Sequence, residues 1–364
     1  MRGRSRAVQP ASLTGYDVID VKGSSYERGF AYGEHHSDRL KRLLQSHYRY
    51  YSTYLNVSRE EVLDEAIKYE GPVRDYSEEV AEELRGTAEG AGVKMSEVML
   101  ITAFNEVLYP KLGKNCTAFG ARGSATSDGL TYIGQNNDEG VEPWLGGDCT
   151  TLTRHRQKDA PDALIYTYVG APAMMGINSA GLSVCINALV YKETQPGVPM
   201  LAVVRSVMNQ KDVEGATREI ERAKRAYSVN FVLGTPKEIV DLETYPDRIL
   251  KSSSDSILWH ANHCLFSEGL RYENDQYRAN SVGRCDRMQQ LLESKSGSLD
   301  RETLQSFLSD HESKPNSICW HVDPSKPPQK QTKTLDSMVY ISEKREAWIA
   351  KGNPCSTEFV KYTV

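Results

Sequence analysis

The chain has 364 residues, of which 39% are hydrophobic and 26% charged, and its net charge at pH 7 is −5. This length and apolar content can bury the cores of one to three domains. The acidic balance argues against a general binder of nucleic acids or anionic membranes. No apolar run reaches the roughly 18 residues that a membrane-spanning helix needs.

The first residues are basic, and no apolar stretch follows them, so we expect no secretory signal. The seven cysteines are odd in number and widely spaced, which favours thiols in a reducing compartment over a disulfide framework. The last residues, 361–364, do not form a peroxisomal signal. These features together predict a cytoplasmic protein.

The chain from about Ser24 to Gly113 has a helical pattern. Ser58 and Glu61 have the spacing of a capping box ahead of apolar positions at helical intervals. Gly71-Pro72 is expected to end that helix. From Cys116 onward the pattern changes to short apolar or β-branched runs separated by turn residues, which predicts strands.

Blocks of strands and helices follow one another after Cys116. Strands are predicted at 117–121, 130–135, 150–155, 164–169, 175–178, 182–188, 228–233, 239–243, 338–342, 347–350 and 358–362, and helices at 199–209, 213–223, 281–292 and 301–310. Segregated strands and helices indicate an α+β protein with antiparallel sheets covered by helices. Residues 324–334, rich in Pro, Lys and Gln, are predicted to form an exposed loop.

The change from helix to strand falls at Asn115-Cys116. A cysteine that begins a strand after the flexible Gly113-Lys114 approach is expected to lie exposed at a sheet edge. Composition alone does not distinguish Cys116 from the other cysteines, because most cysteines are small buried apolar residues. A papain-like pair with one of the eight histidines stays open, although the local signature of that family is absent.

Short segments spread over nearly the whole chain occur in an order and spacing typical of one family. They are Tyr26-Glu27-Arg28-Gly29, Tyr32-Gly33, Asn115-Cys116-Thr117-Ala118, Gly134-Gln135-Asn136-Asn137-Asp138, 176–181, Asn187-Ala188-Leu189, Gly197-Val198-Pro199, 260–265, 284–288 and Ser317-Ile318-Cys319. With these segments the chain resembles the cysteine N-terminal-nucleophile hydrolase family of acyl-coenzyme A:6-aminopenicillanic acid acyltransferase.

The resemblance implies an α+β fold of four αββα layers with a helical N-terminal segment. It also implies a precursor that cuts itself between Asn115 and Cys116. Residues 1–115 would form a helical α fragment and residues 116–364 a catalytic β fragment, together one integrated globular unit. The freed α-amine of Cys116, with a pKa near ~7.7–8.0, would take the proton of its own thiol. One residue then supplies both nucleophile and base.

The resemblance also assigns the residues around the nucleophile. Asn262 matches the family's side-chain oxyanion donor, and a backbone N–H near Asn187 is a candidate for the second donor. Asp138 matches an acidic residue that would orient the new ammonium or hold Asn136 in place. From the residues alone, a turn-stabilising amide is the favoured interpretation of Asn262, whereas Asp138 reads equally well as a turn aspartate before Gly140.

Two serines and three departures concern the substrate. Ser228 and Ser317 align with serines that the family associates with processing or substrate contact. Asn115 stands where the family usually has Gly, and Gly relaxes backbone strain more easily. Asn137 replaces a common aromatic residue. Trp320 replaces a basic residue, which favours an aromatic or apolar acyl group over a substrate carboxylate.

His260, His263 and Cys264 have a spacing that suggests zinc ligands, but three such neighbours cannot all converge unaided, and no second pair follows at finger spacing. We therefore expect no metal and no cofactor, with acyl-coenzyme A as a possible co-substrate. The expected partners are a small-molecule amide or acyl-coenzyme A substrate and the chain's own two fragments, without nucleic acid or membrane.

The predicted function is that of a self-processing amide hydrolase or N-acyltransferase. Its substrate would be a small-molecule or peptide-like amide or acyl thioester, and a cysteine acyl-enzyme would be the intermediate. One alternative is a β-alanyl- or acyl-amide hydrolase without transfer activity. A second, from another class, is a non-processing relative that only binds its ligand.

Overall fold

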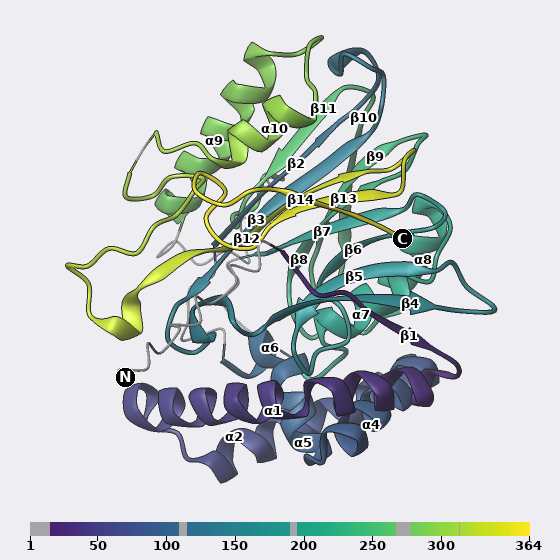
Figure 1. Ribbon diagram of the computed structural model, residues 1–364, viewed down its shortest axis with the longest axis vertical. Helices are drawn as coiled ribbons and strands as arrows, with labels where there is room; N and C mark the ends of the chain where they lie inside the picture. Colours follow the sequence, from purple (N-terminus) through teal and green to yellow (C-terminus); the bar gives the residue numbers. More distant parts are fainter. Residues whose placement is uncertain (1–14, 109–114, 190–194, 267–277, 313) are drawn as a thin grey trace, which may run out of the picture.

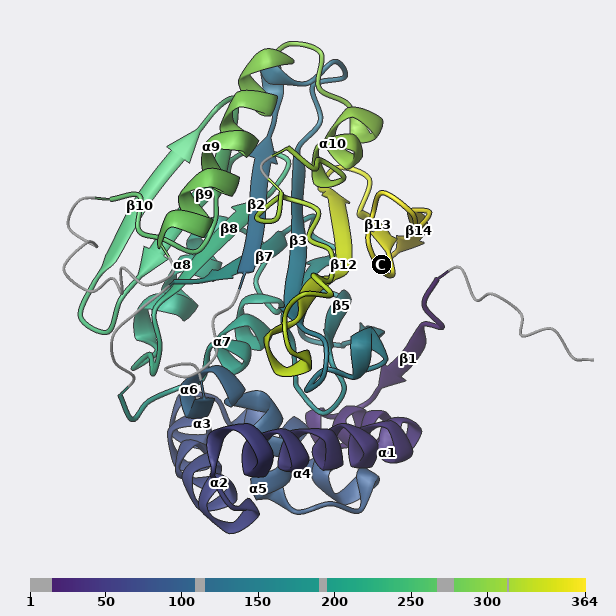
Figure 2. The same ribbon diagram turned by 90° about the vertical axis from the view of Figure 1, so that its left-hand side faces the viewer.

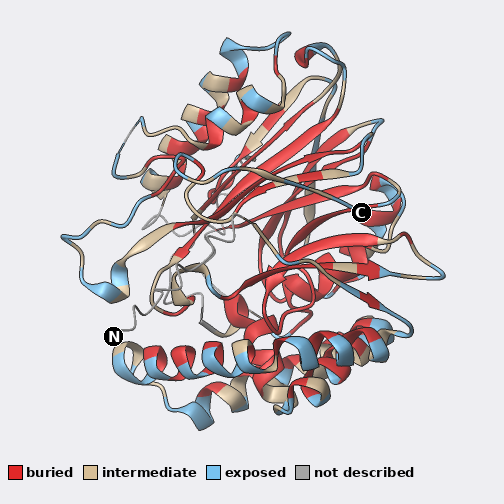
Figure 3. Ribbon diagram, in the orientation of Figure 1, coloured by how far each residue is buried: buried red, intermediate tan, exposed pale blue. Residues whose placement is uncertain are grey.

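The computed structural model describes residues 15–108, 115–189, 195–266, 278–312 and 314–364. Two β-sheets lie face to face, and helices cover the outer face of each, so the chain is built in four layers (Figure 1). Strand residues are mostly buried, whereas the helices turn exposed residues outward (Figure 3). No helix within the described residues is long and apolar enough to span a membrane.

The N-terminal helices form a bundle below the sheets. Ser24 and Ser58 each complete a capping box, and these start α1 and α2. Helices α1 and α4 touch backbone to backbone, because a Cβ on Gly29 would lie 1.9 Å from the carbonyl oxygen of Glu83 and one on Gly86 would lie 2.2 Å from that of Tyr26. The helices are α1 Ser25–Tyr50, α2 Arg59–Ala66, α3 Glu70–Tyr76, α4 Glu78–Ala91, α5 Met95–Thr102 and α6 Phe104–Leu108.

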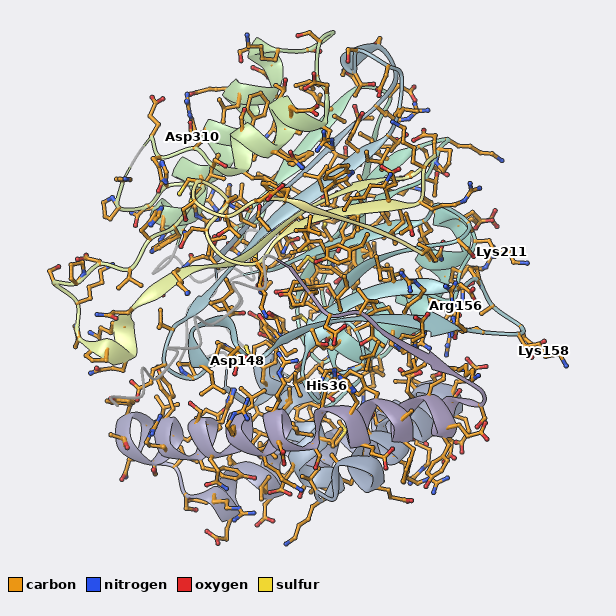
Figure 4. All side chains as sticks on the ribbon, in the orientation of Figure 1. His36, Asp148, Arg156, Lys158, Lys211 and Asp310 are labelled. Atoms are coloured by element: carbon orange, nitrogen blue, oxygen red, sulfur yellow. The ribbon has the colours of Figure 1, made fainter. Side chains whose placement is uncertain are left out.

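Polar contacts fix this bundle to the larger sheet. His36 of α1, labelled in Figure 4, lies with its Nε2 3.0 Å from the Thr151 hydroxyl. Arg205, on a helix of residues 200–207 that packs on this sheet, donates two hydrogen bonds of 2.8 Å to the Glu83 carboxylate of α4. Both members of that ion pair are buried, so removing either one would leave the other charge buried without its partner.

The larger sheet has the strand order β1-β4-β5-β6-β7-β8-β9-β10. Its strands pair antiparallel except β1, which runs parallel to β4. The strands are β1 Ile19–Lys22, β4 Thr150–Arg156, β5 Ala163–Tyr168, β6 Met175–Asn178, β7 Ser183–Ala188, β8 Val229–Gly234, β9 Ile239–Thr244 and β10 Ile249–Ser254. Its outer face carries α7 Met200–Val207 and α8 Val213–Arg222.

The smaller sheet has the order β11-β2-β3-β12-β13-β14, and all its pairs are antiparallel. Its strands are β11 Ile257–His260, β2 Asn115–Ala121, β3 Tyr132–Gly140, β12 Thr332–Ile341, β13 Glu346–Ala350 and β14 Val360–Thr363. Helices α9 Arg278–Ser294 and α10 Arg301–Leu308 lie against its outer face, as Figure 2 shows.

Strand alternation divides the smaller sheet's side chains between two cores. Ala118 and Ile133 belong to the core between the sheets, whereas Phe119 and Tyr132 belong to the core under α9 and α10. The sheets approach closely, since a Cβ on Gly234 of β8 would lie 2.3 Å from Ile133. Along β2, therefore, even-numbered residues face the other sheet and odd-numbered residues face the helices.

The predicted α+β class, with helices before Cys116 and strands after it, is confirmed. The prediction that Gly71-Pro72 ends a helix is wrong: both residues lie in the first turn of α3, where a proline's missing N–H costs nothing. Strands β1, β10 and β11 were not predicted. Most of residues 324–334 form the expected exposed loop, but Thr332 already begins β12.

Candidate active site

Cys116 lies in an interior strand, so the expectation that it is exposed at a sheet edge is wrong. It is 6% exposed, and β2 has β11 on one side and β3 on the other. Strand β11 was not predicted, and it covers the edge from Ala118 to Ala121. Because β11 ends at His260, the side chain of Asn262 replaces a strand partner for Cys116, accepting its backbone N–H at 2.8 Å.

The orientation of the Asn262 amide follows from its partners. Its Oδ1 accepts from the Cys116 N–H and from Nη2 of Arg284 at 2.9 Å, while its Nδ2 donates to the carbonyl oxygen of Ala188 at 2.9 Å. Backbone N–H and guanidinium groups only donate, and a carbonyl only accepts. In the continuous chain Asn262 thus holds the nitrogen of the 115–116 peptide bond, and one Nδ2 hydrogen remains for another acceptor.

Arg284 is the site residue that sequence reasoning missed. It lies on α9 and is 0% exposed. Its guanidinium donates to Cys116 O (2.6 Å), Thr117 Oγ1 (2.7 Å), Asn262 Oδ1 (2.9 Å), Asn280 Oδ1 (3.0 Å) and Asn115 Oδ1 (3.3 Å). The Arg284 cation therefore contacts both residues joined by the 115–116 peptide bond, Asn115 through its side chain and Cys116 through its carbonyl oxygen. Residues 284–288 were noted as a shared segment, but a helical arginine gives no sign of such contacts.

Asp138 faces Arg284 from β3, where it pairs in register with Asn115. Its Oδ1 accepts from the Thr334 hydroxyl at 2.6 Å, whereas its Oδ2 has no hydrogen-bond partner within the described residues. Complete burial raises the pKa of Asp138 to about 7, although the Arg284 charge pulls it down. The carboxyl group can therefore hold or release a proton near neutral pH.

The neighbouring asparagines of β3 point in opposite directions. Asn136 lies on the helix side, where its Nδ2 donates to the carbonyl oxygens of Leu308 (2.8 Å) and Ile318 (2.9 Å). The structure places it away from the Cys116 face, in contact with the segment that holds Ser317. Asn137 pairs with Cys116 and lies between two tyrosine hydroxyls of β5, at 3.0 and 3.2 Å. The tyrosines supply aromatic surface where the family's usual residue is absent.

Polar atoms without partners gather on the facing sheet. Asn187 of β7 pairs in register with Asn230 of β8, and Cys185 lies two residues before Asn187 on the same face. Burial raises the pKa of the Cys185 thiol, and the neighbouring Cys116 raises it further. Within the described residues, Asn187 Nδ2, Asn230 Oδ1 and the Ser228 hydroxyl have no hydrogen-bond partner although all are buried. Buried polar groups usually have a hydrogen-bond partner, so these three are candidates for contact with water or a ligand.

The segment around Ser317 and Trp320 closes the helix side of the site. The Ser317 hydroxyl donates to the carbonyl oxygen of Cys319 at 2.7 Å, so it shapes this turn. Trp320 is 5% exposed, and its ring centre lies 5.9 Å from the Arg284 guanidinium carbon. Its backbone N–H donates to Thr334, the residue that also binds Asp138. Of the predicted site residues, Asn262 contacts Cys116 directly, while Asp138 shares the helix face of β3 with Asn136 and faces Arg284.

The histidines near Asn262 have protein partners. His260 lies with its Nε2 3.0 Å from a Glu243 oxygen and its Nδ1 2.8 Å from the carbonyl oxygen of Ala261. Burial lowers the pKa of His260, but the carboxylates of Asp241 and Glu243 outweigh it and raise the value to about 9. The raised pKa favours the charged form of His260, which pairs with Glu243 two residues before Asn262 in the chain.

Comparison with known proteins finds relatives among both sequences and solved structures. The chain is 25% identical over 284 residues to the acyl-coenzyme A:6-aminopenicillanic-acid-acyltransferase 40 kDa form of Emericella nidulans, covering 75% of each chain. Among solved structures it resembles penicillin V acylase from Agrobacterium tumefaciens (15% identity, 64% of this chain and 82% of that one, TM-score 0.44). It also resembles conjugated bile acid hydrolase from Clostridium perfringens (13%, 68% and 97%, TM-score 0.46).

The model of one protein family, acyl-coenzyme A:6-aminopenicillanic acid acyl-transferase, matches residues 124–356. The match begins after Cys116 and spans the strands and helices that surround it. Because it covers well over half of the chain, this protein belongs to the acyl-coenzyme A:6-aminopenicillanic acid acyl-transferase family and is an N-acyltransferase or amidohydrolase.

Proposed function

We propose that the chain cuts its own peptide bond between Asn115 and Cys116, and that Cys116 then forms an acyl-enzyme with a small-molecule or peptide-like amide or acyl thioester. One observation carries this proposal. The bond at Cys116 is held from both ends by buried side chains, with Asn262 on its nitrogen side and Arg284 on Asn115 and on the Cys116 carbonyl.

The chemical reason for a cut is that it gives Cys116 a base of its own. The two histidines beside Asn262 have other partners, Glu243 for His260 and Ser281 for His263. Cleavage would create an α-amine with a pKa near ~7.7–8.0 on the same residue as the thiol. The amine would then accept the thiol proton, directly or through water.

Asp138 and Asn262 are suited to hold the new amine. The Cys116 nitrogen already lies 2.8 Å from Asn262 Oδ1, an acceptor that can also bind an ammonium. Asp138 has a carboxylate oxygen without a partner in the described chain, one register position away. A cation formed beside it would favour its ionised form and lower its pKa.

The acylation step uses the facing sheet. The thiolate attacks the substrate carbonyl, a C–S bond forms, and the C–N or C–S bond to the leaving group breaks as that group takes the proton. Asn187 Nδ2 and the remaining Nδ2 hydrogen of Asn262 are the donors available for the oxyanion. The Ser228 hydroxyl is a third buried polar group without a hydrogen-bond partner in the described chain. Water then releases an acid, or an amine takes the acyl group.

The two fragments would remain one unit after the cut. Residues before 116 supply β1 of the larger sheet and the Glu83 partner of Arg205. Acyl-coenzyme A is the proposed donor when the reaction is transfer, and no bound cofactor is needed for the chemistry. Trp320 would offer an aromatic wall to the acyl group, beside the Arg284 cation.

Trapping of the acyl-enzyme tests this proposal. Purified protein is mixed with an aryl-acyl coenzyme A thioester or an N-aryl-acyl amide, quenched in acid, digested and analysed by mass spectrometry. We expect the acyl mass on the peptide that begins with Cys116, and none in Cys116→Ala. Cys185→Ala, which removes the neighbouring buried thiol, is the matched control and should still be acylated. Acylation of another residue, or of none with either donor, would overturn the proposal.

A further inference from the structure

A second cluster of reactive side chains lies on the far side of the Trp320 segment. It consists of His311, Cys319, His321 and Cys355, whose ligand atoms all lie within 4.8 Å of one another. Among the described residues this is the one group of metal-binding side chains assembled in this way. His311 follows α10, Cys319 and His321 flank Trp320, and Cys355 lies between β13 and β14.

The other three side chains of the cluster all lie close to one ring nitrogen of His321. His321 Nε2 lies 2.9 Å from His311 Nε2, 3.5 Å from Cys319 Sγ and 3.3 Å from Cys355 Sγ. A ring nitrogen has either one hydrogen or one lone pair, so it can satisfy only one of these three neighbours. A tetrahedral metal ion satisfies all four ligands at once.

The distances fit zinc. With Zn–N near 2.0–2.1 Å and Zn–S near 2.3 Å, the ligand atoms of a tetrahedral site are about 3.3–3.8 Å apart. The three separations from His321 Nε2, 2.9 to 3.5 Å, are close to that size, and all four ligand atoms lie within 4.8 Å of one another. Two thiolates neutralise the charge of the ion, and each loses its proton when the metal binds. Asn353 Nδ2, 3.5 Å from Cys319 Sγ, is a donor for one thiolate.

We propose that His311, Cys319, His321 and Cys355 form a Cys₂His₂ site for a zinc ion. The ion would join the end of α10, the Trp320 segment and the β13–β14 loop. His321 and Cys355 are exposed, which leaves a path for the metal, while Cys319 is buried. The site would be structural, since four protein ligands leave no open position.

The ligands anchor a wall of the candidate active site. Cys319 donates its backbone N–H to the carbonyl oxygen of Asp310, which Figure 4 labels beyond α10. Asn353 donates to the carbonyl oxygen of Trp320 at 2.7 Å, and Trp320 in turn binds Thr334, the partner of Asp138. Zinc would therefore fix the segment that faces Arg284. The sequence-based expectation of no metal considered only His260, His263 and Cys264, because the fourth ligand of the new cluster, Cys355, lies 34 residues beyond His321.

Metal content, cobalt spectra and thiol labelling test the site without any assay of activity. The full chain is purified in reducing buffer with zinc, then compared with Cys355→Ser and His311→Ala, and with His35→Ala as an exposed-histidine control outside the cluster. We expect about one zinc per chain in wild type and in His35→Ala, and much less in the two ligand variants. Cobalt-loaded wild type should show a thiolate-to-cobalt charge-transfer band that weakens in Cys355→Ser.

Alkylation of Cys355 gives a local readout that does not depend on any variant folding. Because Cys355 is exposed, iodoacetamide should label it rapidly in chelator-treated wild type and at least ~10-fold more slowly after one equivalent of zinc. The proposal is overturned if zinc leaves the labelling rate unchanged, if wild type holds no more zinc than Cys355→Ser, or if Cys319 and Cys355 are joined in a disulfide in reducing buffer.

Discussion

Replacing Arg284 with methionine is the sharpest test of how the site is held together. The substitution keeps much of the side-chain volume and removes every guanidinium donor. Two of the acceptors that it abandons, the Cys116 carbonyl oxygen and the Thr117 hydroxyl, belong to buried residues of β2. Neither can turn to water without disturbing that strand.

The expected cost follows from these contacts. A hydrogen bond from a charged donor contributes about 1.5–3 kcal/mol, but bonds that share one cation do not add independently. Breaking a buried charged network usually costs about 3–5 kcal/mol, and we expect the Arg284→Met loss in unfolding free energy to fall in that range. Loss of the Asp138 partner adds to it, because Arg284 is the cation that favours the ionised carboxyl.

Urea denaturation of chains that carry Cys116→Ala, which removes the nucleophile and any self-cleavage, measures this cost. Arg287→Met is the matched control: it lies on the same helix, with 22% of its side chain exposed, and pairs with Asp310 and Glu312. Its loss should cost about 0–1 kcal/mol. If the two variants lose the same stability, the role assigned to Arg284 is wrong.

Three further predictions concern the same site. Burial raises the folded-state pKa of Asp138 to about 7, so its contribution to the stability of Cys116→Ala should be complete below pH 4 and lost as the pH rises through 7. In urea titrations at several pH values, adding Asp138→Asn should flatten this decline in the unfolding free energy. An unchanged slope against pH would contradict the assignment. Ser228→Ala should keep the unfolding free energy within about 0.5 kcal/mol yet slow acylation of Cys116 about tenfold, whereas a large stability loss with normal acylation would mean that the hydroxyl has a structural partner. Asn115→Gly should release the two fragments at least as fast as wild type in a gel time course, because Gly relaxes the backbone; slower release would show that the Asn115 contact with Arg284 assists the cut.

Local sequence patterns predicted much of the fold. Ser58 and Glu61 marked a helix start because a capping box uses side chains three residues apart. The hairpin of β6 and β7 was readable from its turn. Strand β11 was not, because four residues next to a histidine-rich turn lack a clear alternation. That omission led to the prediction of Cys116 at a sheet edge, whereas β11 pairs with β2 from Ala118 to Ala121 and Asn262 binds the Cys116 N–H beyond its end.

Sequence motifs could single out candidate residues one at a time, but they could not show where distant segments meet. The family motifs pointed to Cys116, Asp138 and Asn262. They did not identify Arg284, because no pattern in the sequence of α9 indicates that its guanidinium contacts β2. The His311–Cys355 cluster was not predicted for the same reason, since Cys355 comes from the β13–β14 connection and the other three members from the segment after α10.

The central claim is that Cys116 becomes a chain terminus, and the intact mass of freshly purified protein tests it most directly. We predict two masses, for residues 1–115 and 116–364, with a free α-amine on Cys116, and a single full-length mass for Cys116→Ala. A wild-type preparation that acylates Cys116 while every molecule keeps residues 115 and 116 joined would contradict the account.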